Sequence, residues 1–132
     1  MNVDAIDHLV MNVRDVEPTC RWYEQVLGMQ RLDYGDAPDR PRTAILFGNQ
    51  RINLRPVGLA SSEWMTAEYA ANGSDDLCFL TEFSPDQVLT HLRTCNVEII
   101  EGPTKRHGAR GPITSVYCRD PDGSLIEIAS YL

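Results

Sequence analysis

AIDHLVMNVRDVEPTCRWYEQVLG, residues 5–28, decides the fold because it sets an alternating strand directly before an amphipathic helix. Its first part, AIDHLVMNV, is rich in apolar and β-branched side chains with polar ones between them, which predicts a strand. Apolar residues between Val16 and Leu27 then recur at helical spacing. Asp15 is the expected N-cap of this helix, and Gly28 is its expected C′ residue.

The residues that follow this helix predict three further strands. Residues 29–35 (MQRLDYG) are typical of a strand, and residues 36–42 (DAPDRPR) are typical of a polar loop. Residues 43–47 and 51–56 are separated by a short GNQ turn and predict a hairpin. The first half of the chain therefore has the order βαβββ.

The second half of the chain repeats this order. SDDLCFLT (residues 74–81) predicts a strand, and SPDQVLTHLRTCN (residues 84–96) predicts a helix with Ser84 as N-cap and Gln87 closing a capping box. The remaining segments predict a strand, a loop and then a hairpin around a DPDG turn: residues 97–102, 103–112, 113–119 and 124–130.

Two copies of one pattern define the expected architecture. We expect an α+β fold in which two paired βαβββ modules form a curved mixed sheet around a central cavity, with the helices on the outer faces. Residues 1–132 form a single domain in this interpretation. The first module covers about 4–57, the linker covers 58–73, and the second module covers about 74–131.

Charge and composition exclude several classes of protein. The chain carries 12 Lys and Arg against 19 Asp and Glu, a net charge of −7, which disfavours binding to nucleic acid or to anionic membranes. It has no apolar run of about 18 residues and no N-terminal signal pattern, so we expect no membrane span and a cytoplasmic location. The four cysteines form no C-x-x-C pair and are expected to be reduced.

Four polar residues are expected on the concave faces of the two modules. Aligning DHL with DDL sets His8 opposite Asp76, and aligning RINLR with LIEIA sets Asn53 opposite Glu127. Period-two alternation turns all four away from the helices. Their nitrogen and oxygen donors suit a divalent metal, and three protein ligands with open positions are typical of a catalytic site.

Each of these residues also has a simpler interpretation. His8 is compatible with a hydrogen-bonded strand histidine, and Asp76 with a turn or capping role. Asn53 is compatible with a sheet-edge hydrogen bond. A carboxylate in a buried strand needs a partner, and an ion pair with Arg55 or Arg119 is the alternative for Glu127.

IDHLVMNVRDVEPTCRWYEQVLGM near the start and YCRDPDGSLIEI near the end resemble the two ends of a vicinal oxygen chelate protein. That superfamily includes glyoxalase I, bleomycin-resistance proteins, fosfomycin-resistance enzymes and extradiol dioxygenases. FGNQRINLR, GSDDLCFLT and EGPTKRHGARGPITSVYCRDPDGSLIEI are similar to the short, single-domain glyoxalase-like proteins, among them a virulence-associated bacterial group. The resemblance covers essentially the whole chain.

The resemblance implies a divalent metal, which is Zn, Ni, Mn, Co or Fe, near the junction of the modules. It implies His8, Asn53, Asp76 and Glu127 as ligands, with Glu127 also able to act as a base. The chain departs from glyoxalase I at the two middle positions, which disfavours the glyoxalase I reaction itself. Arg55 stands where related short proteins often carry histidine, and it can hold a carboxylate or phosphate in a bidentate manner.

The resemblance also implies a substrate site and a homodimer. The loop that corresponds to KRHGARG lies over the pocket mouth in the family, so its basic groups are expected to attract an anion. The expected substrate-binding residues are Arg55, His107, Arg110, Tyr117 and Arg119.

These expectations give one leading function and two alternatives. The leading hypothesis is a metal-dependent lyase or isomerase that stabilises an enolate or oxyanion of a small, oxygenated, anionic substrate. A metal-free protein that binds a cationic drug of the bleomycin type is the first alternative. A ring-cleaving dioxygenase is the second, and it is disfavoured because only one inward histidine is placed.

Overall fold

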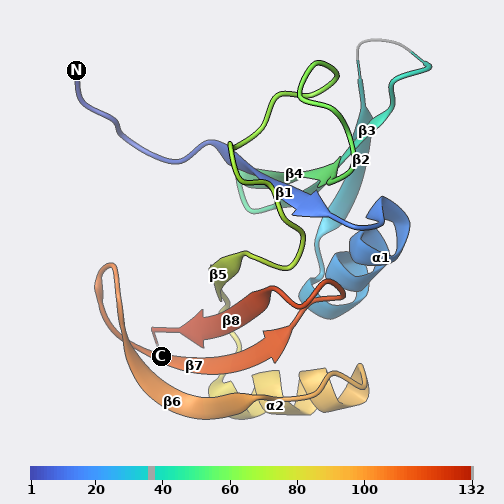
Figure 1. Cartoon of the computed structure of the whole chain (residues 1–132). Coiled ribbons are helices and arrows are strands. Elements are labelled where there is room, and N and C mark those ends of the chain that lie inside the picture. Colours follow the sequence, from blue (N-terminus) through green and yellow to red (C-terminus); the bar gives the residue numbers. More distant parts are fainter. Residues whose placement is uncertain (36–37, 132) are drawn as a thin grey trace. The chain divides into compact units, whose positions relative to one another are not determined.

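The computed structural model describes residues 1–35 and 38–131. The chain forms two compact units, Met1–Asn72 and Gly73–Leu132, and each unit contains one four-stranded sheet and one helix (Figure 1). The expected α+β fold with two βαβββ modules is confirmed.

The first unit has a mixed sheet in the order β1-β4-β3-β2. The β1 and β4 strands are parallel, whereas β3 pairs antiparallel with both β4 and β2. The elements are β1 (His8–Val13), α1 (Val16–Leu27), β2 (Gln30–Tyr34), β3 (Arg42–Phe47) and β4 (Gln50–Pro56).

The second unit has the same plan in the order β5-β8-β7-β6. The β5 and β8 strands are parallel, and the β8–β7 and β7–β6 pairs are antiparallel. The elements are β5 (Asp76–Leu80), α2 (Pro85–Thr94), β6 (Glu101–Gly108), β7 (Gly111–Arg119) and β8 (Leu125–Ser130).

Both helices begin and end as their sequences predict. The Asp15 side chain accepts a hydrogen bond from the backbone of Glu17, and Gly28 adopts a left-handed conformation with a φ of 63°. Ser84 and Gln87 form the expected capping box of α2. Neither helix in the described ranges is long and apolar enough to cross a membrane.

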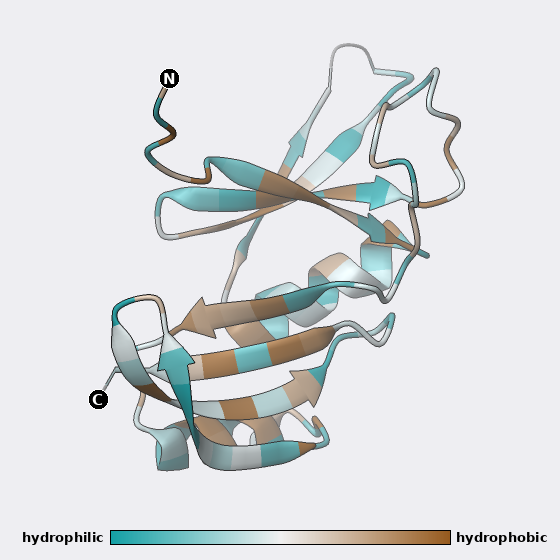
Figure 2. Cartoon of the chain, turned by 60° about the vertical axis from the view of Figure 1, so that its left-hand side comes forward, coloured by the Kyte–Doolittle hydropathy of each residue, from teal (hydrophilic) through white to brown (hydrophobic). Residues whose placement is uncertain are grey.

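Alternation along the strands separates a helix-facing surface from an open surface in each unit. In the first unit the Tyr23 hydroxyl of α1 contacts the Met11 sulfur at 3.7 Å, and Met11 pairs with Leu54 across β1 and β4. In the second unit Ile126 and Ile128 of β8 are buried on the α2 side. Figure 2 shows the resulting alternation of hydrophobic and hydrophilic bands along the strands. The remaining face of each sheet is therefore free to carry polar side chains.

One strand lies elsewhere than the sequence indicates. The expected strand at residues 97–102 and loop at residues 103–112 are wrong, because β6 runs from Glu101 to Gly108 and β7 begins at Gly111. β6 is the edge strand, its residues alternate between exposed and half-buried, and it carries Pro103 beside a register irregularity. Polar alternation, charge and proline are typical of edge strands, which lack the apolar pattern used to recognise buried ones.

The segment between the two repeats folds onto the first unit, which extends to Asn72. Glu63 and Trp64 donate backbone hydrogen bonds to the Ala60 carbonyl in a turn. Trp64 is buried, and the Arg42 guanidinium lies 4.0 Å from its ring centroid. The segment is thus ordered by aromatic packing and turns.

Candidate functional site

A pocket of about 410 Å³ lies on the open face of the second sheet, and we call it the unit 2 pocket. Its floor includes Cys78, Tyr117 and Glu127, which form one row across β5, β8 and β7 because Glu127 pairs with both of the others. The β6–β7 hairpin supplies one wall, and Leu80 and Tyr131 supply another. Strand register alone therefore brings a carboxylate, a phenol and a thiol together.

The side chains beside Glu127 in its row carry no charge. The Ser115 hydroxyl donates to Oε1 of Glu127, and Tyr117 and Cys78 stand on either side of this residue in the sheet. In the part of the chain that the structure describes, Glu127 forms no ion pair. Its negative charge is therefore left for a cation, a proton or a substrate group to balance.

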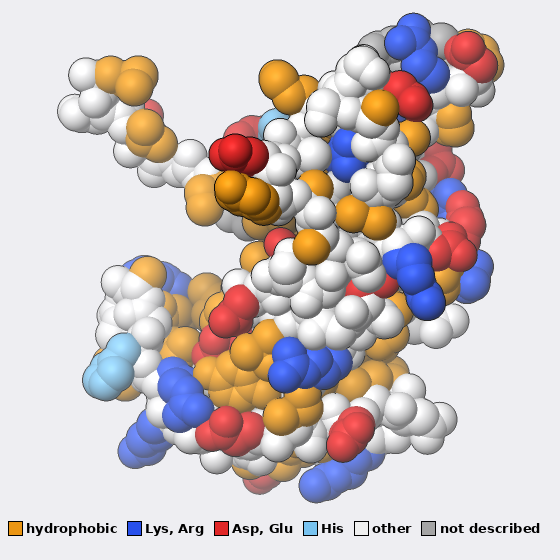
Figure 3. All heavy atoms as spheres, in the orientation of Figure 1, with side chains coloured by type: hydrophobic (Ala, Val, Ile, Leu, Met, Phe, Trp, Pro, Cys, Tyr) orange, Lys and Arg blue, Asp and Glu red, His pale blue; other side chains and the backbone are white. Residues whose placement is uncertain are grey.

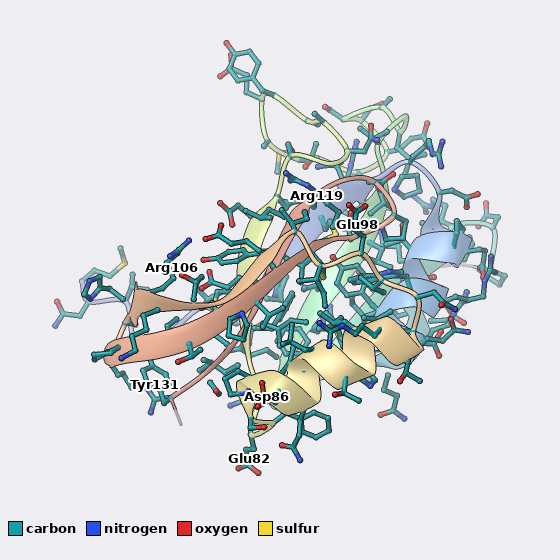
Figure 4. All side chains as sticks on the ribbon, turned by 90° about the horizontal axis from the view of Figure 1, so that it is seen from below. Glu82, Asp86, Glu98, Arg106, Arg119 and Tyr131 are labelled. Atoms are coloured by element: carbon teal, nitrogen blue, oxygen red, sulfur yellow. The ribbon has the colours of Figure 1, made fainter. Side chains whose placement is uncertain are left out.

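Arg106 supports this row from the edge strand. Its Nε donates to the Tyr117 hydroxyl at 3.1 Å, and one Nη atom donates to Oε1 of Glu101 at 2.8 Å. A further hydrogen bond of 3.0 Å runs to the Thr104 hydroxyl. Figure 4 shows the Arg106 side chain at the hairpin end of the sheet, whereas Arg119 lies toward the opposite end.

The environment keeps two pocket groups protonated at neutral pH. Burial, with the nearby Glu127 carboxylate, raises the pKa of the Cys78 thiol from 9.0 to about 11. Burial also raises the pKa of Tyr117, and its hydrogen bond to Glu127 acts in the same direction while Arg106 opposes them. Both groups therefore keep a hydrogen that they can donate within the pocket.

The hairpin wall is fixed to Tyr131. The backbone N–H of Arg110 donates to the Tyr131 hydroxyl at 3.0 Å, and the Arg110 guanidinium lies 4.5 Å from the Tyr131 ring centroid. Gly108 permits this approach, because a Cβ there would lie 2.6 Å from the Tyr131 hydroxyl. Arg110 and Tyr131 also line an adjoining pocket of about 320 Å³. Figure 3 shows basic and histidine side chains gathered over this end of the second unit.

Two predicted ligands lie on the first sheet. His8 begins β1 with its side chain 42% exposed, and its Nδ1 is 2.7 Å from the Asp7 carboxylate. Asn53 is buried on β4, and among the described residues its side-chain oxygen has no hydrogen-bond partner. Because His8 pairs with Arg51 and Val10 pairs with Asn53, His8 and Asn53 are diagonal neighbours on one face.

Arg55 is 1% exposed and holds the segment that follows β4. Its guanidinium donates to the carbonyl oxygens of Leu59 at 2.7 Å and Trp64 at 3.0 Å, and to the side-chain oxygen of Asn12 at 2.9 Å. This geometry favours a structural role. The predicted contact of Arg55 with substrate stays a prediction.

The structure gathers part of the predicted site in one place. Glu127, Tyr117 and His107 line the unit 2 pocket, and Arg110 lines the adjoining one. Asp76 is exposed, pairs with Leu125 and does not line the unit 2 pocket, and Arg119 donates to the Gly123 carbonyl at 3.2 Å. Within the described ranges, no three His, Cys, Asp or Glu side chains are grouped closely enough to hold a metal. The four-residue ligand set stays a prediction.

Sequence reasoning missed four residues around Glu127: Ser115, Cys78, Arg106 and Tyr131. Period-two alternation does place Cys78 inward, but its thiol was expected only to be reduced, and no role in the site was assigned to it. Ser115 shares the parity of Tyr117 along β7, which is a usable signal. Arg106 was hidden because its strand was interpreted as a loop.

Comparison with known proteins gives concordant matches. Residues 5–128 match the family described as Glyoxalase/Bleomycin resistance protein/Dioxygenase superfamily. Virulence protein STM3117 of Salmonella typhimurium is 41% identical over 132 residues, which cover 100% of this chain and 88% of that protein. Glyoxalase domain-containing protein RDO1 of Mycosarcoma maydis is 40% identical over 99% of this chain and 70% of its own length. The solved structure of integron cassette protein VCH_CASS1 of V. cholerae matches with a TM-score of 0.91 and 42% identity, covering 100% of this chain and 98% of that one.

Proposed function

The chain belongs to the Glyoxalase/Bleomycin resistance protein/Dioxygenase superfamily, and from this premise we propose that it is a glyoxalase-like, divalent-metal-dependent enzyme. Its substrate is a small oxygenated anion, and the reaction is of the lyase or isomerase type. The unit 2 pocket is the substrate site in this proposal.

One observation carries the proposal. Glu127 lies in a pocket of about 410 Å³, and the side chain that donates a hydrogen bond to it, Ser115, is neutral. A half-buried carboxylate without a cation is costly unless a ligand completes its surroundings. The arrangement therefore suits a site that gains a metal ion or a substrate proton.

The donor types of the predicted ligands fit a divalent metal. Glu127 supplies a carboxylate without an ion-pair partner in the described ranges, Asn53 supplies a buried amide oxygen whose hydrogen bond is unmade there, and His8 supplies an exposed imidazole. In this proposal these three residues hold the metal together with Asp76. The metal, when bound, supplies Lewis-acid stabilisation of negative charge on substrate oxygens.

The residues of the chain perform the remaining tasks. Oε2 of Glu127 accepts a proton from the carbon beside a substrate carbonyl, because Oε1 is engaged by Ser115. The Tyr117 hydroxyl, which stays protonated, donates a hydrogen bond to substrate. His107 and Arg110 attract the anionic substrate to the hairpin side of the pocket.

The proposal includes a homodimer, supported by the expectation that the sequence resemblance gives. In such a dimer, ligands from two chains can complete one site. Light scattering at several protein concentrations tests this part on its own. The cytoplasmic location expected from the sequence stays a prediction.

A metal-free function in drug binding is the second candidate, and one observation favours it. Glu127 carries a negative charge beside the rings of Tyr117 and Tyr131 in a protein of net charge −7. This combination attracts a cationic, partly apolar ligand. The rings already face Arg106 and Arg110, which weakens the attraction.

Metal analysis separates the two candidates. Protein purified without a metal-affinity tag is analysed for bound metals, alone and as the His8→Ala and Glu127→Ala variants. His91→Ala and Glu98→Ala are matched controls on α2 and the segment after it. The enzyme proposal expects about one metal per chain in the parent and controls and loss in both site variants. Absence of metal after loading with Zn, Ni, Mn, Co and Fe contradicts it.

A substrate panel then identifies the reaction class. It contains the hemithioacetal of methylglyoxal and glutathione, epoxides offered with thiols, and bleomycin in a binding assay. Turnover that requires added metal and Glu127 supports the enzyme. Binding of bleomycin by metal-free protein, without turnover, supports the second candidate.

A further inference from the structure

Ser115 is a buried serine whose hydroxyl reaches Glu127. Its side chain is 0% exposed, and its hydroxyl donates to Oε1 of Glu127. A buried hydroxyl needs a partner, and the carboxylate fills that role. The two residues lie diagonally across β7 and β8, since Tyr117 pairs with Glu127 and Ser115 pairs with Ala129. The strand register therefore fixes this contact.

The contact of Arg106 determines where the Tyr117 proton points. Arginine has donors and no acceptor, so the Tyr117 oxygen accepts from Nε of Arg106 at 3.1 Å. The phenol hydrogen is then free to be donated to another acceptor, and Tyr117 pairs with Glu127 across β7 and β8. Arg106 thus turns the Tyr117 hydrogen away from itself.

Cys78 completes the set from the other side of Glu127. It stands beside Glu127 on the parallel strand β5, as Tyr117 does on β7. A carboxylate has about four acceptor positions on its two oxygens. The Ser115 hydroxyl occupies one of them on Oε1, and the neighbouring strands confine the carboxylate from both sides.

We propose that Ser115 is a positioning residue whose hydroxyl holds Oε1 of Glu127, so that the carboxylate keeps one orientation and presents its other oxygen, Oε2, to the unit 2 pocket. Oε2 would then be the atom that Glu127 offers to a metal ion or to a substrate proton. The inference rests on the proposed function, because positioning matters only if Glu127 binds a ligand.

Paired substitutions isolate the hydroxyl of Ser115. Ser115→Thr and Ser115→Val add nearly the same volume, but only threonine keeps the hydroxyl. Ser115→Ala removes the hydroxyl without adding volume, should the larger pair fail to fold. Ser130→Thr and Ser130→Val are the matched control, because Ser130 is buried on β8 and its hydroxyl has no partner in the described residues.

The first measurement is the urea midpoint of unfolding for each variant, with Glu127 intact and in the Glu127→Ala background. We expect Ser115→Val to unfold at lower urea than Ser115→Thr when Glu127 is present, and the difference to vanish in Glu127→Ala. The Ser130 pair shows no dependence on Glu127. Equal midpoints for the Ser115 pair, or a difference that persists without Glu127, overturn the inference.

The second measurement is the affinity for Zn²⁺ by calorimetry. Loss of a residue that orients a metal ligand typically costs about 10- to 100-fold in affinity, so Ser115→Val should bind Zn²⁺ that much more weakly than Ser115→Thr. Equal affinities overturn the positioning role. If no variant binds Zn²⁺ while the urea data show coupling, the proposed function fails and the positioning contact stands.

Discussion

At the residue scale, the pKa of Tyr117 depends on two opposite charges beside its hydroxyl. Its hydroxyl lies between the Glu127 carboxylate and the Arg106 guanidinium, which act on its pKa in opposite directions. Glu127 favours the protonated phenol, and Arg106 favours the phenolate. Because burial is the largest influence, the net pKa lies above its ordinary value of 10.0.

Replacing each neighbour should therefore move the pKa of Tyr117 in a known direction. Glu127→Gln removes the negative charge and should lower this pKa, whereas Arg106→Gln removes the positive charge and should raise it. Titration of tyrosine absorbance, with the Tyr117→Phe difference used for assignment, measures both shifts. Shifts of the same sign in the two variants would contradict the described contacts.

Arg55 makes structural hydrogen bonds that its sequence position does not indicate. An arginine at an inward strand position suits a substrate carboxylate, yet its donors serve the oxygens of Leu59, Trp64 and Asn12. Those acceptors lie in a segment without regular secondary structure or in another strand. The sequence alone could not show them, because non-local hydrogen bonds leave no periodic signal.

Removing the Arg55 donors should loosen this segment. Arg55→Met keeps much of the side-chain volume but leaves buried acceptors unpaired, at about 1–3 kcal/mol for each such group. We expect a lower urea midpoint and faster amide exchange in residues 57–66. Arg51→Met on the same strand is the control, since Arg51 is only half-buried and lies over the Tyr34 ring. An unchanged Arg55→Met variant would contradict the structural role.

At the scale of elements, the helices and most strands were predictable, and the edge strand was not. Asp15, Gly28, Ser84 and Gln87 satisfy backbone groups at helix ends, and that local chemistry is visible in sequence. β6 depends on pairing with β7, and its own residues are polar. The local sequence pattern therefore does not predict a strand such as β6, which forms because it pairs with a neighbouring strand.

The β6–β7 hairpin is an element whose position depends on one glycine. A Cβ at Gly108 would lie 2.6 Å from the Tyr131 hydroxyl and 2.9 Å from a methyl of Ile113. Gly108→Ala should displace Tyr131 from the hairpin and lower stability by about 1–3 kcal/mol, as overpacking does. The urea midpoint and ligand binding at the pocket are the measurements.

Gly58→Ala is the control for the hairpin prediction. A Cβ at Gly58 meets no atom within 4 Å, and its backbone is not in the left-handed region. This variant should be as stable as the parent or slightly more stable, because alanine restricts the unfolded chain. If Gly108→Ala and Gly58→Ala have the same urea midpoint, the close packing at Gly108 does not contribute to stability.

At the scale of the whole molecule, three thiols make the free energy of unfolding depend on pH in the alkaline range. Burial raises the pKa values of the Cys20 and Cys118 thiols from 9.0 to about 11, and partial desolvation with the nearby Glu127 charge does the same for Cys78, whose residue is exposed. Between these values the folded chain retains protons that the unfolded chain has lost. The unfolded state then binds fewer protons, so stability falls as pH rises.

We therefore expect the urea midpoint to fall between about pH 9 and pH 11, and to fall less steeply in the Cys20→Ala, Cys118→Ala double variant. Both substitutions lower stability at neutral pH by creating small cavities, so the comparison concerns slope rather than level. Equal slopes in parent and double variant would exclude these thiols as the source.

The two repeats, the fold and the family were accessible from sequence, whereas the surroundings of Glu127 were only partly so. Alternation identified Glu127 as an inward carboxylate, but the side chains around it come from two neighbouring strands, β5 and β7, and their placement depends on register. The substrate class and the metal content follow neither from the sequence pattern nor from the register of the strands. They are properties of the completed site and require measurement.

The most direct test of the proposed metal-dependent function is an anomalous-difference map from crystals grown with Zn²⁺, compared with crystals of Glu127→Ala grown in the same way. The proposal predicts a peak in the parent beside one carboxylate oxygen of Glu127, with the Ser115 contact kept, and no such peak in the variant. Absence of a peak at Glu127 in the parent, or a peak that persists at the same place in Glu127→Ala, would contradict it.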